Sequence, residues 1–239
     1  MKKLLCTIFI YSTLQLSAQN DRVVDDNNIT WTQLQTSFKL NDKVSLLGEY
    51  YGRRTDGVKY WQQWMLRTGL QIKATPQLSF TLAYAYIDTY PYGDYPIAAN
   101  GTFPEHRLQQ QVQLKNAFGK LDATQRIRIE QRFIGRRLPN TIDREIEKFL
   151  FSNRFRYMLR LQHPIVNING FNLYGAAADE VFVSAGRNVG VNIFDQNRLM
   201  LLLGSKLSDK VTIEAGYINQ TLMQGRRINN ATIIQDNKG

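Results

Sequence analysis

Apolar and polar residues alternate with a period of two along most of the chain after residue 28. In the stretch 78–86, every second residue from Phe80 to Tyr86 is large and apolar, and the residues between them are small or polar. In 126–133, charged and apolar residues alternate almost without a break. Because successive side chains of a strand point to opposite faces, this pattern predicts strands with one apolar and one polar face.

The alternation predicts ten strands, at residues 29–40, 44–54, 59–74, 78–90, 105–118, 123–136, 149–162, 171–182, 197–206 and 211–222. A strand of a soluble protein usually has about 5–6 residues, whereas a tilted strand that crosses a bilayer needs about 9–11. All ten segments reach the longer length. Strand length therefore favours bilayer-spanning strands over a soluble sandwich.

Short and long connections alternate between these strands. Short polar turns are expected at 41–43, 75–77, 119–122, 163–170 and 207–210, and longer loops at 55–58, 91–104, 137–148 and 183–196 and after Gln224. Two of the short turns share a pattern, KLNDKVSLLGEY at 39–50 and KLSDKVTIEAGY at 206–217, as expected if both lie at the same membrane edge. This organisation predicts an all-β, antiparallel up-and-down transmembrane β-barrel of about 10–12 strands, with tight turns at the periplasmic end. A repeat of propeller blades is the weaker alternative, because each blade would contain four short strands. The loops 91–104 and 183–196 are the expected sites of outside contacts.

The period of two assigns a face to each residue. The apolar face, expected to contact lipid, contains Leu34, Phe38, Leu46, Tyr50, Leu66, Leu70, Phe80, Leu82, Val112, Leu114, Ile127, Ile129, Phe133, Phe155, Leu159, Leu201, Leu203 and Ile213. The polar face, expected to line the lumen, contains Glu49, Arg53, Arg67, Gln71, Arg107, Gln109, Gln111, Gln113, Lys115, Arg126, Arg128, Glu130, Arg132, Arg154, Arg156, Arg160, Glu180, Arg198 and Glu214. An Arg or Lys on the lipid face would cost about 2–4 kcal/mol at mid-bilayer, and this cost most strongly favours an inward charged face in the sixth and seventh predicted strands, 123–136 and 149–162.

A cluster of charges inside the barrel is the main candidate site. It contains Arg107, Arg126, Arg128, Glu130, Arg132, Arg154, Arg156, Arg160, Glu180 and Arg198. One interpretation is a polar core that fills a narrow barrel, since ten to twelve strands leave at most a tight channel. The other is an anion-attracting lumen, because rings of arginine favour anionic or phosphate-bearing solutes. The expected function is a non-enzymatic, porin-like barrel with an Arg-lined lumen, acting as a structural barrel or as an anion-preferring pore for small solutes.

The first eighteen residues have the layout of a secretory signal peptide. Lys2 and Lys3 precede a short apolar run, and small residues end it at Ala18. The predicted division is a signal peptide at 1–18, an N-terminal polar segment at 19–28 and a barrel domain at 29–239. Because Cys6 is the single cysteine, the mature chain would lack thiols, and we expect no cofactor and no metal site.

Charge and histidine content argue against other functions. The net charge of +10 falls to about +8 without Lys2 and Lys3, and it is spread over the strands, so nucleic acid is not an expected partner. His106 and His163 have no sequence-near Ser in a suitable register, which argues against a catalytic Ser–His pair. Carboxylate pairs among Glu105, Glu130 and Glu180 would be held ionised by neighbouring arginines. A lipid-modifying outer-membrane enzyme and a soluble exported ligand-binding barrel remain the alternatives.

Six short motifs occur in a fixed order along the chain. They are Glu105–Leu108, Arg128–Phe133, Asn153–Tyr157, Asp179–Phe182, Phe194–Arg198 and Gly216–Gln220. This set resembles the family of unknown function 2490, which comprises predicted outer-membrane barrels of Gram-negative bacteria such as Bacteroidota. The resemblance implies a location in the cell outer membrane and no established activity. Outer-membrane lipid and the barrel insertion machinery are the implied partners, and a small anionic solute is the partner expected from the arginines.

The C-terminal sequence departs from what an outer-membrane barrel predicts. Such barrels usually end in a strand that closes on an aromatic residue, whereas residues 233–239 have the sequence IIQDNKG, which suggests a loop. The first predicted strand also begins on the loop side. An even-stranded barrel would therefore need one more strand at each end, and we expect the barrel domain to lack its final strand. The alternative is a poor eleventh strand at 226–235.

Overall fold

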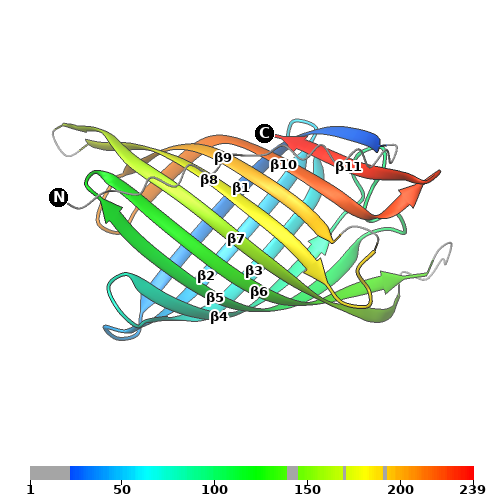
Figure 1. Ribbon diagram of the computed structural model, residues 1–239, viewed down its shortest axis with the longest axis horizontal. Helices are drawn as coiled ribbons and strands as arrows, with labels where there is room; N and C mark the ends of the chain where they lie inside the picture. Colours follow the sequence, from blue (N-terminus) through cyan, green and yellow to red (C-terminus); the bar gives the residue numbers. More distant parts are fainter. Residues whose placement is uncertain (1–21, 139–144, 169–170, 191–192) are drawn as a thin grey trace, which may run out of the picture.

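Eleven strands form a closed barrel in the computed structural model (Figure 1), which describes residues 22–138, 145–168, 171–190 and 193–239. The predicted signal peptide lies outside these residues. The strands are β1 (Arg22–Lys39), β2 (Val44–Thr55), β3 (Tyr60–Lys73), β4 (Leu78–Thr89), β5 (Phe103–Phe118), β6 (Leu121–Arg137), β7 (Ile146–Ile168), β8 (Phe171–Ala185), β9 (Phe194–Lys206), β10 (Thr212–Ile228) and β11 (Ala231–Lys238). Within the described ranges, no helix is long and apolar enough to cross a membrane.

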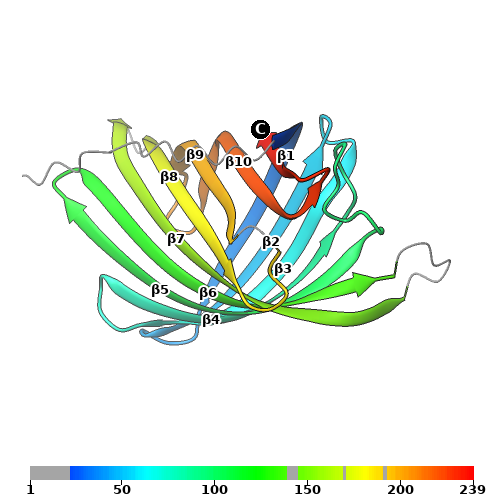
Figure 2. The same ribbon diagram turned by 45° about the vertical axis from the view of Figure 1, so that its right-hand side comes forward.

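Each strand pairs antiparallel with the next one along the chain, so the predicted antiparallel barrel of 10–12 strands is confirmed. The closing pair is the exception. β1 and β11 run parallel, with Arg22–Asn28 opposite Thr232–Lys238, because an odd number of alternating strands makes the first and the last run in the same direction. Figure 2 shows β11 beside the beginning of β1. We call the barrel end with the short turns the turn side, and the other end the loop side.

The C-terminal end corrects the prediction. Residues 233–239 were expected to be a loop, whereas residues 231–238 form β11, so the alternative of an eleventh strand is correct in kind and its predicted position, 226–235, begins and ends too early. Asn229 and Asn230 have φ values of 48° and 66°, and this left-handed pair makes the two-residue turn of a tight hairpin. Strand β1 also begins earlier than expected, at Arg22. β7 extends into the expected 163–170 turn, and β8 and β9 shorten the expected 183–196 loop.

Three turns on the turn side have the same pattern of hydrogen bonds. The amides of Leu40 and Asn41 donate to the carbonyl of Val44 at 2.9 and 3.2 Å, and Leu207 and Ser208 donate to Val211 at the same distances. The Asn41 and Ser208 side chains each accept two amides from the next residues of their turn. Thr75 has the same role in the third turn. The repeated KLND and KLSD sequences therefore form equivalent turns at one end of the barrel.

The two faces of the wall are as the alternation predicts. The residues assigned to the apolar face are exposed or half-buried on the outside, for example Leu34, Leu82 and Ile213. Aromatic side chains group on this face toward the loop side, where Trp64 packs on Tyr86 and Phe133 on Phe151. The inward residues are buried around the middle of the barrel and become more exposed toward the turn side.

Strand β11 closes the wall on the loop side only. In the described residues, β1 beyond Asn28 pairs with β2 alone, and Thr212–Tyr217 of β10 pair with β9 alone. The last backbone rung between β10 and the C-terminus joins Ile218 to Gly239. The turn-side half of the wall therefore has two strand edges that face each other without an intervening strand in the part of the chain that the structure describes.

The connection between β4 and β5, residues 90–102, folds inward over the β1–β11 pair. The amides of Asp94 and Tyr95 donate to the carboxylate of Asp25 in β1, and Tyr92, which is buried, donates to Gln235 in β11 at 3.1 Å. A side chain at Gly93 would lie 2.5 Å from the same carboxylate, so only glycine permits this approach. The predicted outward recognition loop thus packs on the closing pair.

Candidate functional site

Three glutamates from three strands form the centre of a charge network inside the barrel. Glu105 of β5, Glu130 of β6 and Glu180 of β8 are almost completely buried. Their strands bring them inward because each lies on the polar face of its alternating pattern. A buried carboxylate is tolerated when it is paired and hydrogen-bonded, and each of these three is surrounded by arginines.

The arginines connect the three glutamates to one another. Glu105 receives Arg107 at 2.9 Å and Arg132 at 2.6 Å, and Arg107 also lies 3.9 Å from Glu130. Arg156 bridges the other two carboxylates, with 2.7 Å to Glu130 and 2.8 Å to Glu180.

The remaining ion pairs extend this chain in both directions. Arg154 contacts Glu130 at 2.6 Å and Asp195 at 3.0 Å, while Arg126 and Arg198 contact Glu180 at 2.9 and 3.4 Å. Because consecutive pairs share a member, these side chains form one network across the lumen rather than isolated bridges. Because one side chain takes part in several ion pairs, removing any single member weakens more than one pair of the network.

Aromatic rings fill the space between the guanidinium groups. Phe182 is 1% exposed, and the guanidinium of Arg156 lies 4.4 Å from its ring centre. Trp31 lies 4.0 Å from Arg53 and 4.6 Å from Arg198, measured from its ring centre to each guanidinium carbon. The contacts with Trp31 add stabilisation at Arg53, which forms no ion pair with a carboxylate in the described residues, and at Arg198, which forms one.

We define the central network as these charged groups and their inward neighbours. It comprises Arg53, Arg67, Arg107, Arg126, Arg128, Arg132, Arg154, Arg156 and Arg198 with Glu49, Glu105, Glu130, Glu180 and Asp195. Nine arginines thus face five carboxylates, an excess of four positive charges.

The structure brings together nine of the ten residues that were predicted as the lumen cluster. The exception is Arg160, which lies nearer the turn side and pairs with Glu214 and Gln162. Tyr174 completes this second group by donating to Glu214 at 2.6 Å. Arg160 therefore belongs to a separate, partly exposed ion pair.

Seven members of the site were not in the predicted cluster. Three of them, Arg53, Arg67 and Glu49, were predicted to line the lumen outside that cluster, and four were not assigned to the lumen. Glu105, Asp195, Trp31 and Phe182 all point inward. The period of two could have identified Glu105 and Phe182 as inward-facing. Glu105 lies two residues from Arg107, and Phe182 lies two residues from Glu180, and both of these were predicted to line the lumen. Asp195 was missed because it lies in the expected 183–196 loop.

The turn-side half of the lumen has a different lining. Glutamines replace most of the arginines here, and Gln33 and Gln35 of β1 are exposed while Gln71 and Gln113 are half-buried. On β5, Gln109 is 1% exposed, whereas Gln113, four residues closer to the turn, is accessible. We call this accessible region the vestibule, and it ends at the central network.

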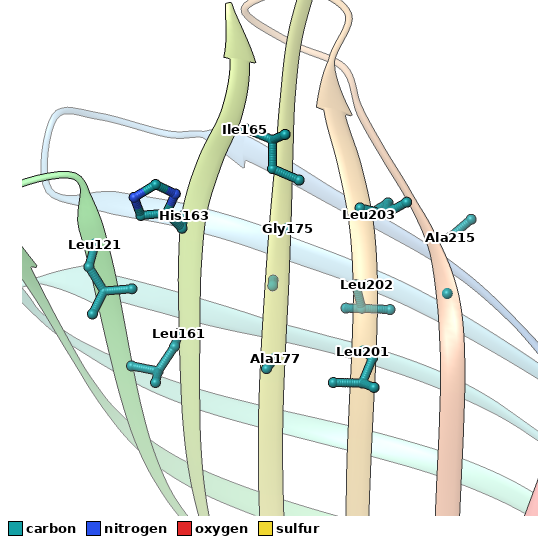
Figure 3. Close-up of a pocket in the computed structure, with 12 residues that line it drawn as sticks. Leu121, Leu161, His163, Ile165, Gly175, Ala177, Leu201, Leu202, Leu203 and Ala215 are labelled. Carbon is teal, nitrogen blue, oxygen red and sulfur yellow. The ribbon is translucent and has the colours of Figure 1, made fainter.

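Both histidines lie on the outer wall. The ring of His106 hydrogen-bonds with the Tyr84 hydroxyl at 2.6 Å and packs against Tyr86 and Phe149. His163 lies beside an apolar groove of about 550 Å³. Figure 3 shows Gly175 and Ala177 between the leucines of β7 and β9 in this groove. A groove forms there because neither residue has a side chain that fills the gap.

No group of three or more His, Cys, Asp or Glu side chains in the described ranges is placed to hold a metal ion. No curated protein and no solved structure matches the chain at a significant level. Residues 28–231 match the family described as "Protein of unknown function (DUF2490)", a match that extends from the middle of β1 to the start of β11. The chain therefore belongs to this family of unknown function.

Proposed function

We propose that this protein is an integral outer-membrane β-barrel whose lumen is closed by the central network. In this proposal it serves as a structural barrel that is open to the turn side and blocked toward the loop side. The single observation that carries the closure is the set of buried ion pairs that runs from Glu105 through Arg107 to Glu130, and from Glu130 through Arg156 to Glu180.

The outer wall supports the membrane location. Strands β1 to β10 contain 12–23 residues, enough to cross a bilayer at a tilt. Large apolar residues such as Phe38, Leu66 and Leu203 are more than half exposed on the outside. A soluble protein rarely exposes so many, whereas lipid requires them.

The burial of the network supports a closed rather than an open lumen. Glu130 is 0% exposed and accepts from arginines on a neighbouring strand, so side chains occupy the middle of the barrel. Opening a path for a solute would separate these buried pairs, and breaking one such pair typically costs about 3–5 kcal/mol. An anion-preferring pore is therefore the less favoured role of the same arginines.

The positions of the histidines and glutamates favour a non-enzymatic role. His106 contacts Tyr84 on the outer wall rather than a serine, and His163 lies on the same outer face. The glutamates that could act as acid and base are held in ion pairs with arginines. Groups held in this way lack the free proton-transfer capacity that general acid–base catalysis needs.

Planar-bilayer recordings test the closure. We expect the purified protein to insert without steady conductance, and we expect the double variant Glu130→Ala/Arg156→Ala to give an anion-preferring current, since it removes the bridging side chains. Glu214→Ala, which changes a partly exposed pair outside the network, is the matched control and should remain silent. A steady anion current in the unchanged protein, reduced by Arg156→Ala alone, would contradict the proposal. Solubility of the folded chain without detergent would contradict the membrane location.

A further inference from the structure

An apolar groove follows β8 on the outer wall near the turn side. Its floor is formed by Gly175 and Ala177, whose outward positions carry little or no side chain. Its two walls are aliphatic side chains of β7 and β9, namely Leu161, Ile165, Leu201 and Leu203. Leu161 and Leu201 are the register partners of Ala177, so the groove runs lengthwise between two ridges, as Figure 3 shows. We call it the β8 groove.

The lining of the β8 groove favours hydrocarbon over water. Of the twelve described residues that line it, His163 has a polar side chain and the others are Gly, Ala, Leu or Ile. An ordered water needs about two to four polar partners, whereas apolar cavities remain dry. The groove volume of about 550 Å³ lies within the range of about 300–1,000 Å³ that is typical of sites for small organic ligands. While the groove is unfilled, its walls also forfeit dispersion contacts.

The floor of the groove is open because of its two small residues. Ala177 is exposed on the outer face. A Cβ at Gly175 would lie 3.3 Å from Cδ1 of Ile165, so this isoleucine leans over the glycine and narrows the turn-side end. A large side chain at Ala177 would therefore occupy the space that a ligand needs.

A positive charge and an imidazole lie at one corner of the turn-side end. His163 of β7 and Leu121 of β6 both line this corner, since the adjacent Asp122 pairs with Gln162 (Figure 3). Lys120 precedes Leu121 in the turn between β5 and β6, and it is exposed. None of the lysine ion pairs in the described ranges includes Lys120. Asp122 belongs to the opposite, inward face, because Leu121 points outward.

We propose that the β8 groove binds one acyl chain of a phospholipid whose anionic headgroup lies at the corner formed by Lys120 and His163. The inference rests on the proposed membrane location, because the groove then opens to hydrocarbon and its turn-side end reaches the headgroups. The aliphatic walls recognise the chain, and the lysine complements the negative charge of the phosphate. A chain held in this way packs against fixed side chains, and packing rather than transfer from water stabilises contacts within a membrane.

Native mass spectrometry of the full barrel released from detergent micelles tests this site. The probe is dioleoyl phosphatidylglycerol, added in increasing amounts. We expect saturable binding of one lipid per barrel. Ala177→Phe fills the groove and should weaken this binding by about tenfold or more, equivalent to about 1.4 kcal/mol. Lys120→Gln should weaken it by about two- to fivefold, as expected for one exposed charge contact.

Leu66→Phe is the matched control, because it adds an aromatic ring to the exposed outer face of β3, away from the groove. It should leave the lipid affinity unchanged. Glycerol phosphate, which has the phosphate of the lipid without its chains, should not compete. Competition at equal concentration would mean that the corner binds phosphate alone and would overturn the proposal. Equal losses in the Ala177 and Leu66 variants would overturn it as well, since the lipid would then coat the wall without a site.

The same spectra separate this inference from the proposed function. Lipid-free dimers of the unchanged protein that Ala177→Phe converts to monomers would mean that a second copy covers the groove, and would overturn the lipid site. A barrel that inserts into bilayers but retains no single lipid would overturn the lipid site alone. A folded chain that is soluble without detergent would overturn the membrane location first. Folded-barrel migration of each variant on gels shows that lost binding is not lost structure.

Discussion

The loop-side and turn-side halves of this barrel accommodate their inward-facing polar residues in different ways. Both must place polar residues inside, since the outer face is apolar in both. The loop-side half buries charged pairs, such as Arg154 with Glu130, and its loop 90–102 folds inward onto the β1–β11 pair. The turn-side half leaves glutamines and the Arg160–Glu214 pair accessible. The difference shows that an alternating strand pattern fixes which face is polar and leaves open whether that face is packed or hydrated.

Charge pairing has a different energetic meaning in the two halves. A buried pair such as Arg156 with Glu180 cannot lose one partner without leaving a charge in a poorly solvated space. A pair that water reaches, such as Arg160 with Glu214, contributes about 0–1 kcal/mol. Two pairs of the same chemical type are therefore expected to respond very differently to substitution.

Chemical labelling should give the largest contrast between the halves. Single cysteines at Gln109 and Gln113 lie on the same face of β5, and Cys6 is the only native thiol to remove. We expect a water-soluble maleimide to modify Gln113→Cys at least about tenfold faster than Gln109→Cys, because the reagent reaches a buried position only when the structure opens locally. Labelling rates followed by mass spectrometry measure this ratio. Equal rates would mean that the two halves are equally hydrated.

Removing one buried carboxylate should give the next largest effect. Glu130→Gln keeps the shape but removes the charge that Arg154 and Arg156 contact, so we expect the free energy of unfolding to fall by about 3–5 kcal/mol. Glu214→Gln in the other half should lower it by about 1 kcal/mol or less. Denaturant titration in micelles, followed by tryptophan fluorescence, measures both. If the two variants lost similar amounts of unfolding free energy, ion pairs in the two halves would contribute equally to stability, contrary to this prediction.

The loop that packs on the closing strands should have a smaller effect. Tyr92→Phe removes a hydroxyl that contacts Gln235 and Asn237, and we expect a loss of about 1 kcal/mol. Tyr84→Phe removes a hydroxyl from the exposed contact with His106 on the outer wall and serves as its control. The same titration should show the first variant less stable than the second. A neutral Tyr92→Phe would mean that the loop does not hold the closing pair.

Much of the fold can be predicted from the sequence, because the same alternation of apolar and polar residues recurs in almost every strand. Alternation located ten strands, their faces and the inward arginines without any contact information. The eleventh strand was only the alternative prediction and was placed at 226–235, since residues 225–230, with the sequence GRRINN, show no clear alternation. The Asn229–Asn230 pair was the available signal, because asparagine tolerates the left-handed conformation that tight hairpin turns need.

The pairing inside the lumen could not be derived in the same way. The alternation along the strand predicts that Arg156 points inward. It does not predict that this side chain bridges the carboxylates of Glu130 in β6 and Glu180 in β8. That choice depends on the stagger between strands and on side chains that cross the barrel. The inward folding of residues 90–102 could not be predicted either. A polar loop of this length has the same composition whether it projects outward or packs on Asp25.

The parallel closing pair also determines the order in which the barrel forms. Ten of the eleven strand pairings join neighbours in the chain and can form as hairpins, one after another. The pairing of β1 with β11 joins residues as far apart as Asp25 and Gln235, separated by 210 positions. Contacts between such distant segments are slow to form, and parallel ladders are slightly weaker than antiparallel ones. We therefore expect closure at this pair to be the last step of folding, and we expect the same pair to separate first when the wall opens.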